Sequence, residues 1–265
     1  MRKSLMMTAA AVLLTAAFAA AETPDAADLI QKSLNAYHYG GADGKSTISM
    51  EIIDKNGSVR ERKMVMLRLN VGDKGGDQRF FVYFKEPGDV REMTFMVYKN
   101  VKGDDDRWIF IPSVKLVRRL AADDKRSSFV GSDFTYEDVS GRSVAQDEHT
   151  LVKEEDLNGQ AAYVVKSVPK DKVEYSHKLT WISKDTYLPL KEEYYNGDGK
   201  LSRVFTAENI EKIDDIPTPI KRVMENLESG SKTVITIEKA DYNVNLDEKD
   251  FSERRMRRPP RNWIR

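Results

Sequence analysis

Short stretches of strand character follow one another along most of this chain, and signals for tight turns separate them. Four turn signals are prominent: 54–57 (Asp-Lys-Asn-Gly), 86–88 (Glu-Pro-Gly), 157–159 (Leu-Asn-Gly) and 196–199 (Asn-Gly-Asp-Gly). Such residues favour the backbone geometry of hairpins. We expect strands at 46–53, 59–69, 78–85, 92–98, 107–112, 115–120, 149–155, 161–167, 174–183, 188–195, 201–208, 219–227 and 232–240. Because no βαβ pattern appears, the sequence predicts a mainly β protein with an antiparallel meander.

The strands differ in how many of their faces are apolar. Segments 80–84, 93–98 and 108–111 are apolar on both faces, whereas 174–183 and 188–195 carry charged or hydroxyl side chains at alternate positions. A sheet with doubly apolar central strands needs a cover on each side. One cover is the core, and the other is an N-terminal helix together with a bound apolar ligand. In the alternative interpretation, helix and loops fill the space and leave no cavity.

An amphipathic helix is predicted before the first strand. Thr23 can cap it, Pro24 suits its first position, and Asp25 lies favourably at the positive end of the helix dipole. One apolar stripe recurs at helical spacing: Ala26, Leu29, Ile30, Leu34 and Tyr37. The helix ends near 38–41 and needs an apolar surface on which to lie.

Residues 1–21 have the features of a cleavable signal peptide. Arg2 and Lys3 precede the uncharged, largely apolar segment 5–18, and small residues follow at 19–21. The chain contains no cysteine, so a lipobox, disulfides and thiol chemistry are excluded. We therefore expect an exported periplasmic protein whose residues 22–265 form one domain.

The charge balance argues against a nucleic-acid partner. The chain has 43 basic and 43 acidic residues, and without Arg2 and Lys3 the basic count is 41. A nearly neutral chain has no general attraction to nucleic acid. Residues Arg254–Arg265 are an exception, since they include six arginines. This segment is interpreted either as a transient contact with anionic membrane or as a solvated, mobile tail.

Patterns for catalysis and metal binding are absent from the sequence. His38, His149 and His177 are isolated, so no metal site is expected. Ser132 lacks the G-x-S-x-G context of a nucleophile and is interpreted as a turn residue. We expect no cofactor and no enzymatic activity.

Three acidic residues, Asp133, Glu137 and Asp138, lie close together in the sequence. They can be interpreted as a carboxylate cluster for acid–base chemistry. The preferred interpretation is structural: Lys115, Arg118 and Arg119 on the preceding strand pair with these acids and hold the loop on the sheet.

The region from Arg107 to Asp138 resembles the LolA-like outer membrane lipoprotein-sorting family. The resemblance depends on Trp108, Pro112, Arg118, Arg119, Phe129, Gly131, Ser132, Asp133, Phe134, Tyr136, Glu137 and Asp138. It implies a single-domain, open antiparallel half-barrel of the LolA/LolB type, with an N-terminal amphipathic helix and short helices covering the concave face. The 129–138 motif is expected to be either a structural plug or a docking surface.

The resemblance also implies a carrier. Lipid or lipoprotein acyl chains would bind in an apolar concavity and move between an inner-membrane lipid exporter and the outer membrane, carried by a monomer with the N-terminal helix as lid. The expected lining residues are Leu29, Ile30, Leu34, Phe81, Tyr83, Phe95, Trp108 and Phe110. Their facing depends on strand register, because a shift of one residue turns a side chain to the other face. The alternative is a non-enzymatic docking subunit of an envelope transport or assembly complex.

Overall fold

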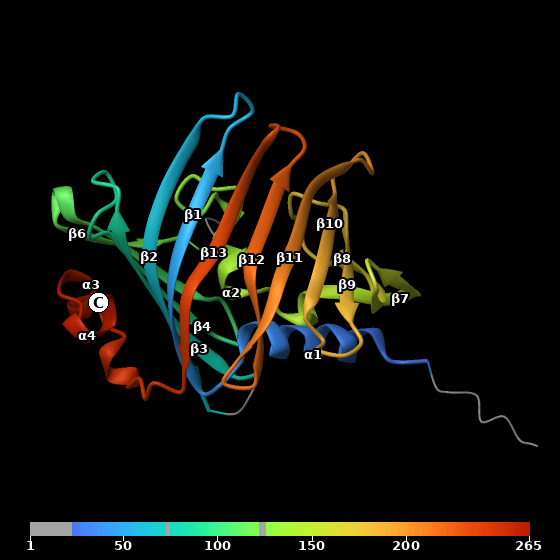
Figure 1. The fold of residues 1–265 in the computed structure, drawn as a ribbon, viewed down its shortest axis with the longest axis horizontal. Helices are drawn as coiled ribbons and strands as arrows, with labels where there is room; N and C mark the ends of the chain where they lie inside the picture. The colour runs from blue at the N-terminus through green and yellow to red at the C-terminus, as the bar shows by residue number, and fades with distance from the viewer. Residues whose placement is uncertain (1–22, 73–74, 122–125) are drawn as a thin grey trace, which may run out of the picture.

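The computed structural model describes residues 23–72, 75–121 and 126–265, and within them thirteen strands form one open, curved antiparallel sheet (Figure 1). The expected signal peptide, 1–21, lies outside the described residues. The strands are β1 (Asp43–Ile53), β2 (Val59–Val71), β3 (Asp77–Glu86), β4 (Thr94–Lys99), β5 (Asp106–Ile111), β6 (Leu116–Leu120), β7 (Asp147–Leu157), β8 (Gln160–Pro169), β9 (His177–Ser183), β10 (Pro189–Tyr195), β11 (Leu201–Ile213), β12 (Ile216–Asn226) and β13 (Ser231–Tyr242). The prediction of a mainly β, open half-barrel is confirmed.

The strand order joins two meanders into one sheet. The strand order is β6-β5-β4-β3-β2-β1-β13-β12-β11-β10-β9-β8-β7. The first meander, β1 to β6, therefore forms one half of the sheet, and the second meander, β7 to β13, forms the other half. Pairing of β1 with β13 closes the two halves together, with Met50 opposite Ile235. The edges of the sheet are therefore β6 and β7, which are consecutive in the sequence but lie at opposite ends of the sheet.

Helix α1 (Ala26–His38) begins later than the sequence predicted. Asp25, rather than Thr23, is the N-cap, and its side chain accepts a hydrogen bond of 2.8 Å from the backbone N–H of Asp28. The carboxylate satisfies a free N–H group and also lies at the positive end of the helix dipole. The stripe around Leu29 and Ile30 is buried against β8 and β9, as an amphipathic helix requires.

The C-terminal segment covers the outer face of the sheet over β2 to β6. Helices α3 (Glu253–Arg257) and α4 (Arg261–Ile264) lie outside β2 in Figure 1 and bury Met256 and Trp263. Apolar side chains of β2 to β5 pack beneath them: Val65, Leu67, Phe81, Met96 and Phe110. This packing contradicts the alternative of a mobile arginine-rich tail, since its apolar residues anchor it to the sheet.

The concave face is covered by residues 126–146, which we call the plug. The plug contains α2 (Tyr136–Ser140), which lies behind β12 and β13 in Figure 1. Phe129 of the plug contacts Phe95 at a ring-centroid distance of 5.6 Å and Tyr136 at 5.4 Å. Aromatic pairs at such distances add to the burial of apolar area. The 129–138 motif therefore packs against the concave face of the sheet.

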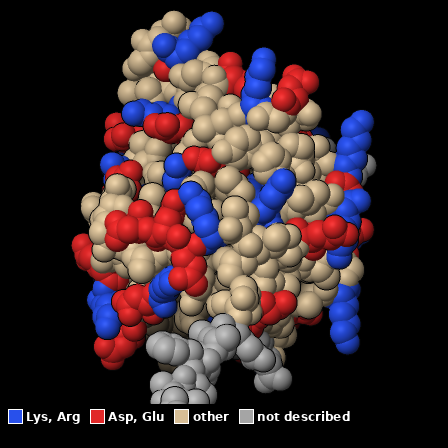
Figure 2. Space-filling model, turned by 90° about the vertical axis from the view of Figure 1, so that its right-hand side faces the viewer, with Lys and Arg blue, Asp and Glu red and all other residues tan. Residues whose placement is uncertain are grey.

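The surface at the β7 side of the molecule carries basic and acidic side chains interspersed, as Figure 2 shows. This agrees with the balanced composition of the chain. In the part of the chain that the structure describes, no helix is both long and apolar enough to cross a membrane.

Candidate functional site

Two neighbouring cavities lie in the concave face, and the plug lines both. The first, here called the charged cavity, has a volume of about 100 Å³, and α1, the plug and β7 to β12 provide its walls. The second, here called the apolar cavity, has a volume of about 120 Å³, and β1 to β3, β12, β13, the plug and the end of α1 surround it. Tyr37, His38, Phe134 and Asp138 line both cavities.

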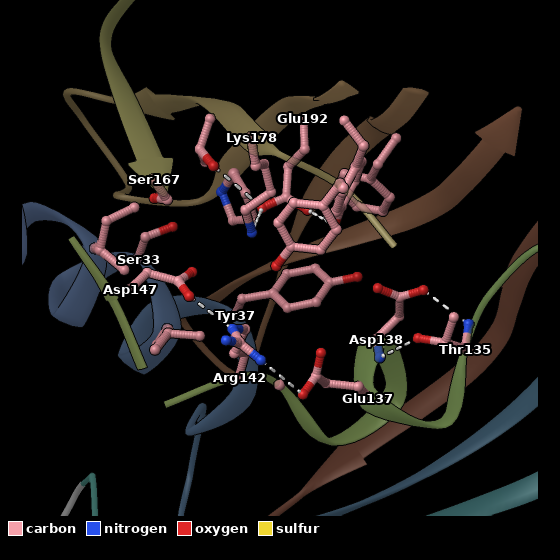
Figure 3. A pocket seen from close by; sticks show the side chains of 18 of the residues that line it. Ser33, Tyr37, Thr135, Glu137, Asp138, Arg142, Asp147, Ser167, Lys178 and Glu192 are labelled. Atoms are coloured by element: carbon pink, nitrogen blue, oxygen red, sulfur yellow. Dashed lines mark hydrogen bonds and ion pairs between the residues drawn. The ribbon is translucent and has the colours of Figure 1, made fainter. Parts of the chain in front are cut away.

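Arg142 is the centre of an ion-pair network in the charged cavity (Figure 3). Its guanidinium lies 2.8 Å from Asp147, 3.3 Å from Glu137 and 2.7 Å from Asp171. Burial alone lowers the pKa of Arg142, but the hydrogen bond to Asp147 and the charges of Glu137 and Asp147 outweigh burial and raise it. The network joins the plug to β7 through Asp147.

Two further cations of the charged cavity also have carboxylate partners. Arg203 on β11 lies 2.6 Å from Asp138 of the plug. Lys178 on β9 lies 2.7 Å from Glu192 on β10 (Figure 3). Asp138 also accepts a hydrogen bond from the backbone N–H of Thr135 in a capping box at the start of α2. Because each of these cations is already paired, the cavity offers little free charge to a ligand.

The apolar cavity has walls of aliphatic, methionine and aromatic side chains. They are Ile48, Met50, Met64, Met66, Phe80, Val82, Phe129, Phe134, Val139, Ile235 and Ile237. Polar groups gather at part of its lining and include Arg68, Arg222 and Tyr242. A cavity of about 150 Å³ lined by apolar side chains stays dry and admits benzene. The volume of about 120 Å³ is smaller, so this conformation is closed to a long chain.

His38 lies between the cavities at the C-terminal end of α1. Burial lowers the pKa of His38 well below its usual value, and the charges of Lys99, Arg222, Arg68 and Lys178 lower it further. The imidazole is therefore neutral at pH 7. Four cations therefore act on His38, although the whole chain has no net charge.

Three of the expected lining residues lie on α1, and one lies on the concave side of β4. Ile30 and Leu34 line the charged cavity, while Leu29 is buried in the cluster that holds α1 on β8 and β9. Phe95 is on the concave side but lies beneath Phe129, in the core under the plug.

The other four expected lining residues lie on the outer face. Phe81, Tyr83, Trp108 and Phe110 pack with the C-terminal segment, and the neighbouring Phe80 and Val82 face the concavity instead. Both faces of β3 are apolar, so alternation could not distinguish them. The structure therefore corrects the expected facing of these four side chains.

The acidic residues of the motif have partners other than those expected. Asp133 accepts hydrogen bonds from Ser231 and, at 2.7 Å, from Thr233 on β13, while Glu137 pairs with Arg142 and Asp138 with Arg203. The prediction that Lys115, Arg118 and Arg119 bind these acids is wrong.

The basic residues lie on the far edge strand instead. Arg118 and Arg119 belong to β6, and Arg119 pairs with Asp106 on the neighbouring β5. Gly131 and Ser132 lie in a tight turn of the plug, where the Ser132 hydroxyl donates to the Phe134 carbonyl at 3.3 Å. A polar residue bound to its own turn agrees with the turn interpretation of Ser132.

Sequence reasoning missed the buried cations of β9, β11 and β12. A weak signal exists, because Arg203 precedes Phe205 by two residues and Arg222 precedes Met224 by two, and residues at this spacing share one face of a strand. An arginine two residues from a core residue is directed to the buried side. Among the described residues, no group of three or more histidine, aspartate or glutamate side chains is arranged to hold a metal ion.

Solved structures with the same fold cover nearly the whole of this chain. An outer membrane lipoprotein-sorting protein domain from Vibrio parahaemolyticus is 27% identical, with a TM-score of 0.81 over 88% of this chain and 98% of that one. A DUF1329 family protein from Desulfovibrio piger is 29% identical, with a TM-score of 0.79 over 87% and 97%. A LolA superfamily protein from Nitrosomonas europaea is 20% identical, with a TM-score of 0.67 over 87% and 99%, and it supports the fold alone.

A family described as "Uncharacterized protein" matches residues 76–258, more than half of the chain. No curated protein matches the sequence. The chain belongs to this family, and its fold is similar to the folds of the outer membrane lipoprotein-sorting, DUF1329 and LolA superfamily structures.

Proposed function

We propose that this protein is a non-enzymatic periplasmic carrier that binds an acyl chain of a lipid or lipoprotein in the apolar cavity. The observation that carries the proposal is a cavity with a continuous apolar wall of aliphatic, methionine and aromatic side chains beneath the plug, which contains the family motif. Each buried CH₂ contributes about 0.8 kcal/mol, so several methylenes offset the cost of opening the site. The family and the signal-like N-terminus support export and transport in the cell envelope.

The plug is the part of the site that must move. The cavity of about 120 Å³ is too small for a long chain, and Phe129, Phe134 and Val139 of the plug form one of its walls. Helix α1, the lid expected from the sequence, is held at its C-terminal end, where the backbone carbonyl of His38 accepts a hydrogen bond of 2.8 Å from Gln78. A ligand would shift the protein toward a state with a displaced plug by binding that state better.

A disulfide between plug and sheet tests this proposal, because the chain has no cysteine of its own. Asp133 and Thr233 are joined by hydrogen bonds, so the double variant Asp133→Cys, Thr233→Cys brings two thiols together. The oxidised variant is expected to exclude a fluorescent fatty-acyl probe that the reduced variant binds. The single variant Asp133→Cys is the matched control.

Equal binding of the probe by oxidised and reduced protein would contradict a moving plug. Absence of binding by the wild type would contradict the carrier itself. It would favour the alternative, a docking subunit of an envelope transport or assembly complex, for which the dense packing of the concave face is the supporting observation.

Delivery requires contact with a membrane or with an exporter, and the C-terminal segment provides a candidate surface. Its exposed arginines are Arg254, Arg257, Arg258, Arg261 and Arg265. Val114, just before β6, and Leu116, the first residue of β6, are also exposed, at 63% and 50%. Arginines with apolar neighbours suit anionic headgroups. Sedimentation with phosphatidylglycerol vesicles should fall when Arg257, Arg258 and Arg261 become glutamine, and unchanged sedimentation would exclude this surface.

A further inference from the structure

Arg222 on β12 brings a positive charge to the apolar cavity without a bound carboxylate. Its guanidinium carbon lies 4.9 Å from the centre of the Tyr37 ring, and its Nε is buried without a hydrogen-bond acceptor. No carboxylate of the described residues lies within ion-pair distance of it. An aromatic face stabilises a cation only partly, so Arg222 retains the capacity to bind an anion.

Arg68 on β2 is a second cation of the same cavity. It is largely buried, and burial lowers its pKa from the usual arginine value, although it stays charged at neutral pH. Its partners are neutral: the side-chain oxygen of Asn70 at 2.6 Å and the backbone carbonyl of Gly40. No ion pair of Arg68 occurs within the described part of the chain.

The acidic residue that lines this cavity does not neutralise the two arginines. Asp138 is committed to Arg203 at 2.6 Å and to the backbone N–H of Thr135 at 2.7 Å. Asp43 acts on Arg68 through its charge alone, because its carboxylate accepts hydrogen bonds from the backbone N–H groups of Val244 and Leu246. A buried cation without an ion-paired carboxylate is costly, and an anion that reaches it gains charge-assisted hydrogen bonds in a site of low dielectric. The cavity therefore favours a ligand with a negative charge.

The remaining walls determine what must be attached to that charge. Met50, Met64 and Met66 lie side by side on β1 and β2, and Ile48 and Ile237 extend the apolar surface. Methionine side chains are unbranched and adapt to ligands of variable shape. A cavity that is mostly apolar and has guanidinium groups at one part of its lining matches an amphiphilic ligand.

We propose that the apolar cavity binds an amphiphile with one acyl chain and an anionic head, a carboxylate or a phosphate, and that Arg222 and Arg68 bind the head. This inference rests on the proposed carrier function and names the ligand class for it. The acyl chain occupies the methionine-rich wall once the plug has moved. The charged cavity plays no part in binding the head, because its cations are paired.

Calorimetric titration of the full chain with four probes tests the proposal: dodecanoate, monododecyl phosphate, dodecanol and inorganic phosphate. We expect at least one anionic amphiphile to bind about 10- to 100-fold more tightly than dodecanol, as charged hydrogen bonds imply. The carboxylate and phosphate probes identify the preferred head. Inorganic phosphate is expected to bind far more weakly than either, because it lacks the chain.

Arg222→Gln should remove most of that preference and leave dodecanol binding unchanged. Lys221→Gln is the matched control, since Lys221 is the next residue of β12 and pairs with Glu208 on the neighbouring strand. The wild-type comparison of dodecanoate with dodecanol needs no variant, so it stands even if Arg222→Gln does not fold.

The outcomes separate the two proposals. Equal binding of dodecanol and both anionic amphiphiles would overturn the anionic-head site and leave the carrier intact. Failure of all three amphiphiles would overturn the carrier. If inorganic phosphate binds as tightly as monododecyl phosphate, the site binds anions without any contribution from the alkyl chain. That result would also overturn this inference.

Discussion

The charged cavity and the apolar cavity lie side by side, yet they treat buried arginines in opposite ways. In the charged cavity Arg142 and Arg203 have carboxylates at 2.6 to 3.3 Å. In the apolar cavity Arg222 and Arg68 have an aromatic ring and neutral oxygens. Paired charges fix the position of the plug, whereas unpaired charges leave a potential for ligand. The location of carboxylates therefore distinguishes the charged cavity from the cavity for which we propose a ligand.

The largest expected effect is on stability at the paired site. Arg142→Met leaves Asp147 and Glu137 buried without their cation, so we expect a loss of about 3–5 kcal/mol in the free energy of unfolding. Urea unfolding followed by circular dichroism measures this change. A loss below about 1 kcal/mol would mean that the network does not hold the plug.

Lys99 gives an intermediate case, a buried cation that donates to the backbone carbonyls of Ser140 and Gly141 in the plug, at 2.9 Å for Gly141. Burial lowers the pKa of Lys99 to about 8 from its usual 10.5. The unfolded chain therefore binds more protons between these values, and stability should rise as pH increases from about 8 to 10.5.

The size of this gain is up to about 3 kcal/mol on the order-of-magnitude scale of such shifts. The matched measurement is the difference in unfolding free energy between the wild type and Lys99→Met across this range. A difference that is constant with pH would contradict a neutralised Lys99 and would place it with the paired cations.

At the unpaired site, the same substitution should have little effect on stability. Arg222→Met removes a buried charge that has no carboxylate partner, so we expect a change within about 1 kcal/mol in either direction when no ligand is bound. The urea experiment used for Arg142→Met measures it. A loss as large as that of Arg142→Met would erase the difference between the cavities and reveal an unrecognised partner for Arg222.

The smallest expected effect is on a titration. The pKa of His38 is lowered first by burial and then by Lys99, Arg222 and Arg68. An anionic head bound to the two arginines would offset their charges, so the pKa of His38 should rise on binding dodecanoate and stay unchanged with dodecanol. NMR titration of the histidine side chains measures it, with His149 as an internal control. A rise with dodecanol as well would assign the change to plug movement instead.

The sequence predicted the strands and hairpins well, because these depend on local chemistry. All expected strands are present, and the turn at Asp54 has the expected form, with its side chain accepting a 2.8 Å hydrogen bond from the N–H of Asn56. The pairing of β1 with β13 depends on residues that are about 190 positions apart, such as Met50 and Ile235, and no local signal specifies it.

The candidate site was predicted less well for the same reason. Phe81 and Phe80 are both buried, so composition could not tell which faces the cavity. The partners of Asp133 and Asp138 lie on β13 and β11, far along the chain, whereas the sequence offered the nearer arginines of β6. The motif lies in one segment of the sequence, but its contacts are long-range.

The free edges of the sheet have a mechanical consequence. No ladder of hydrogen bonds joins β6 to β7, since they stand at the two ends of the strand order. A small change of twist at each of the interior strand pairs would therefore add up to a wide change of curvature without breaking a single ladder. The hollow beneath the plug would thus expand gradually as the two halves spread apart, and under the proposed carrier function this would suit acyl chains of several lengths.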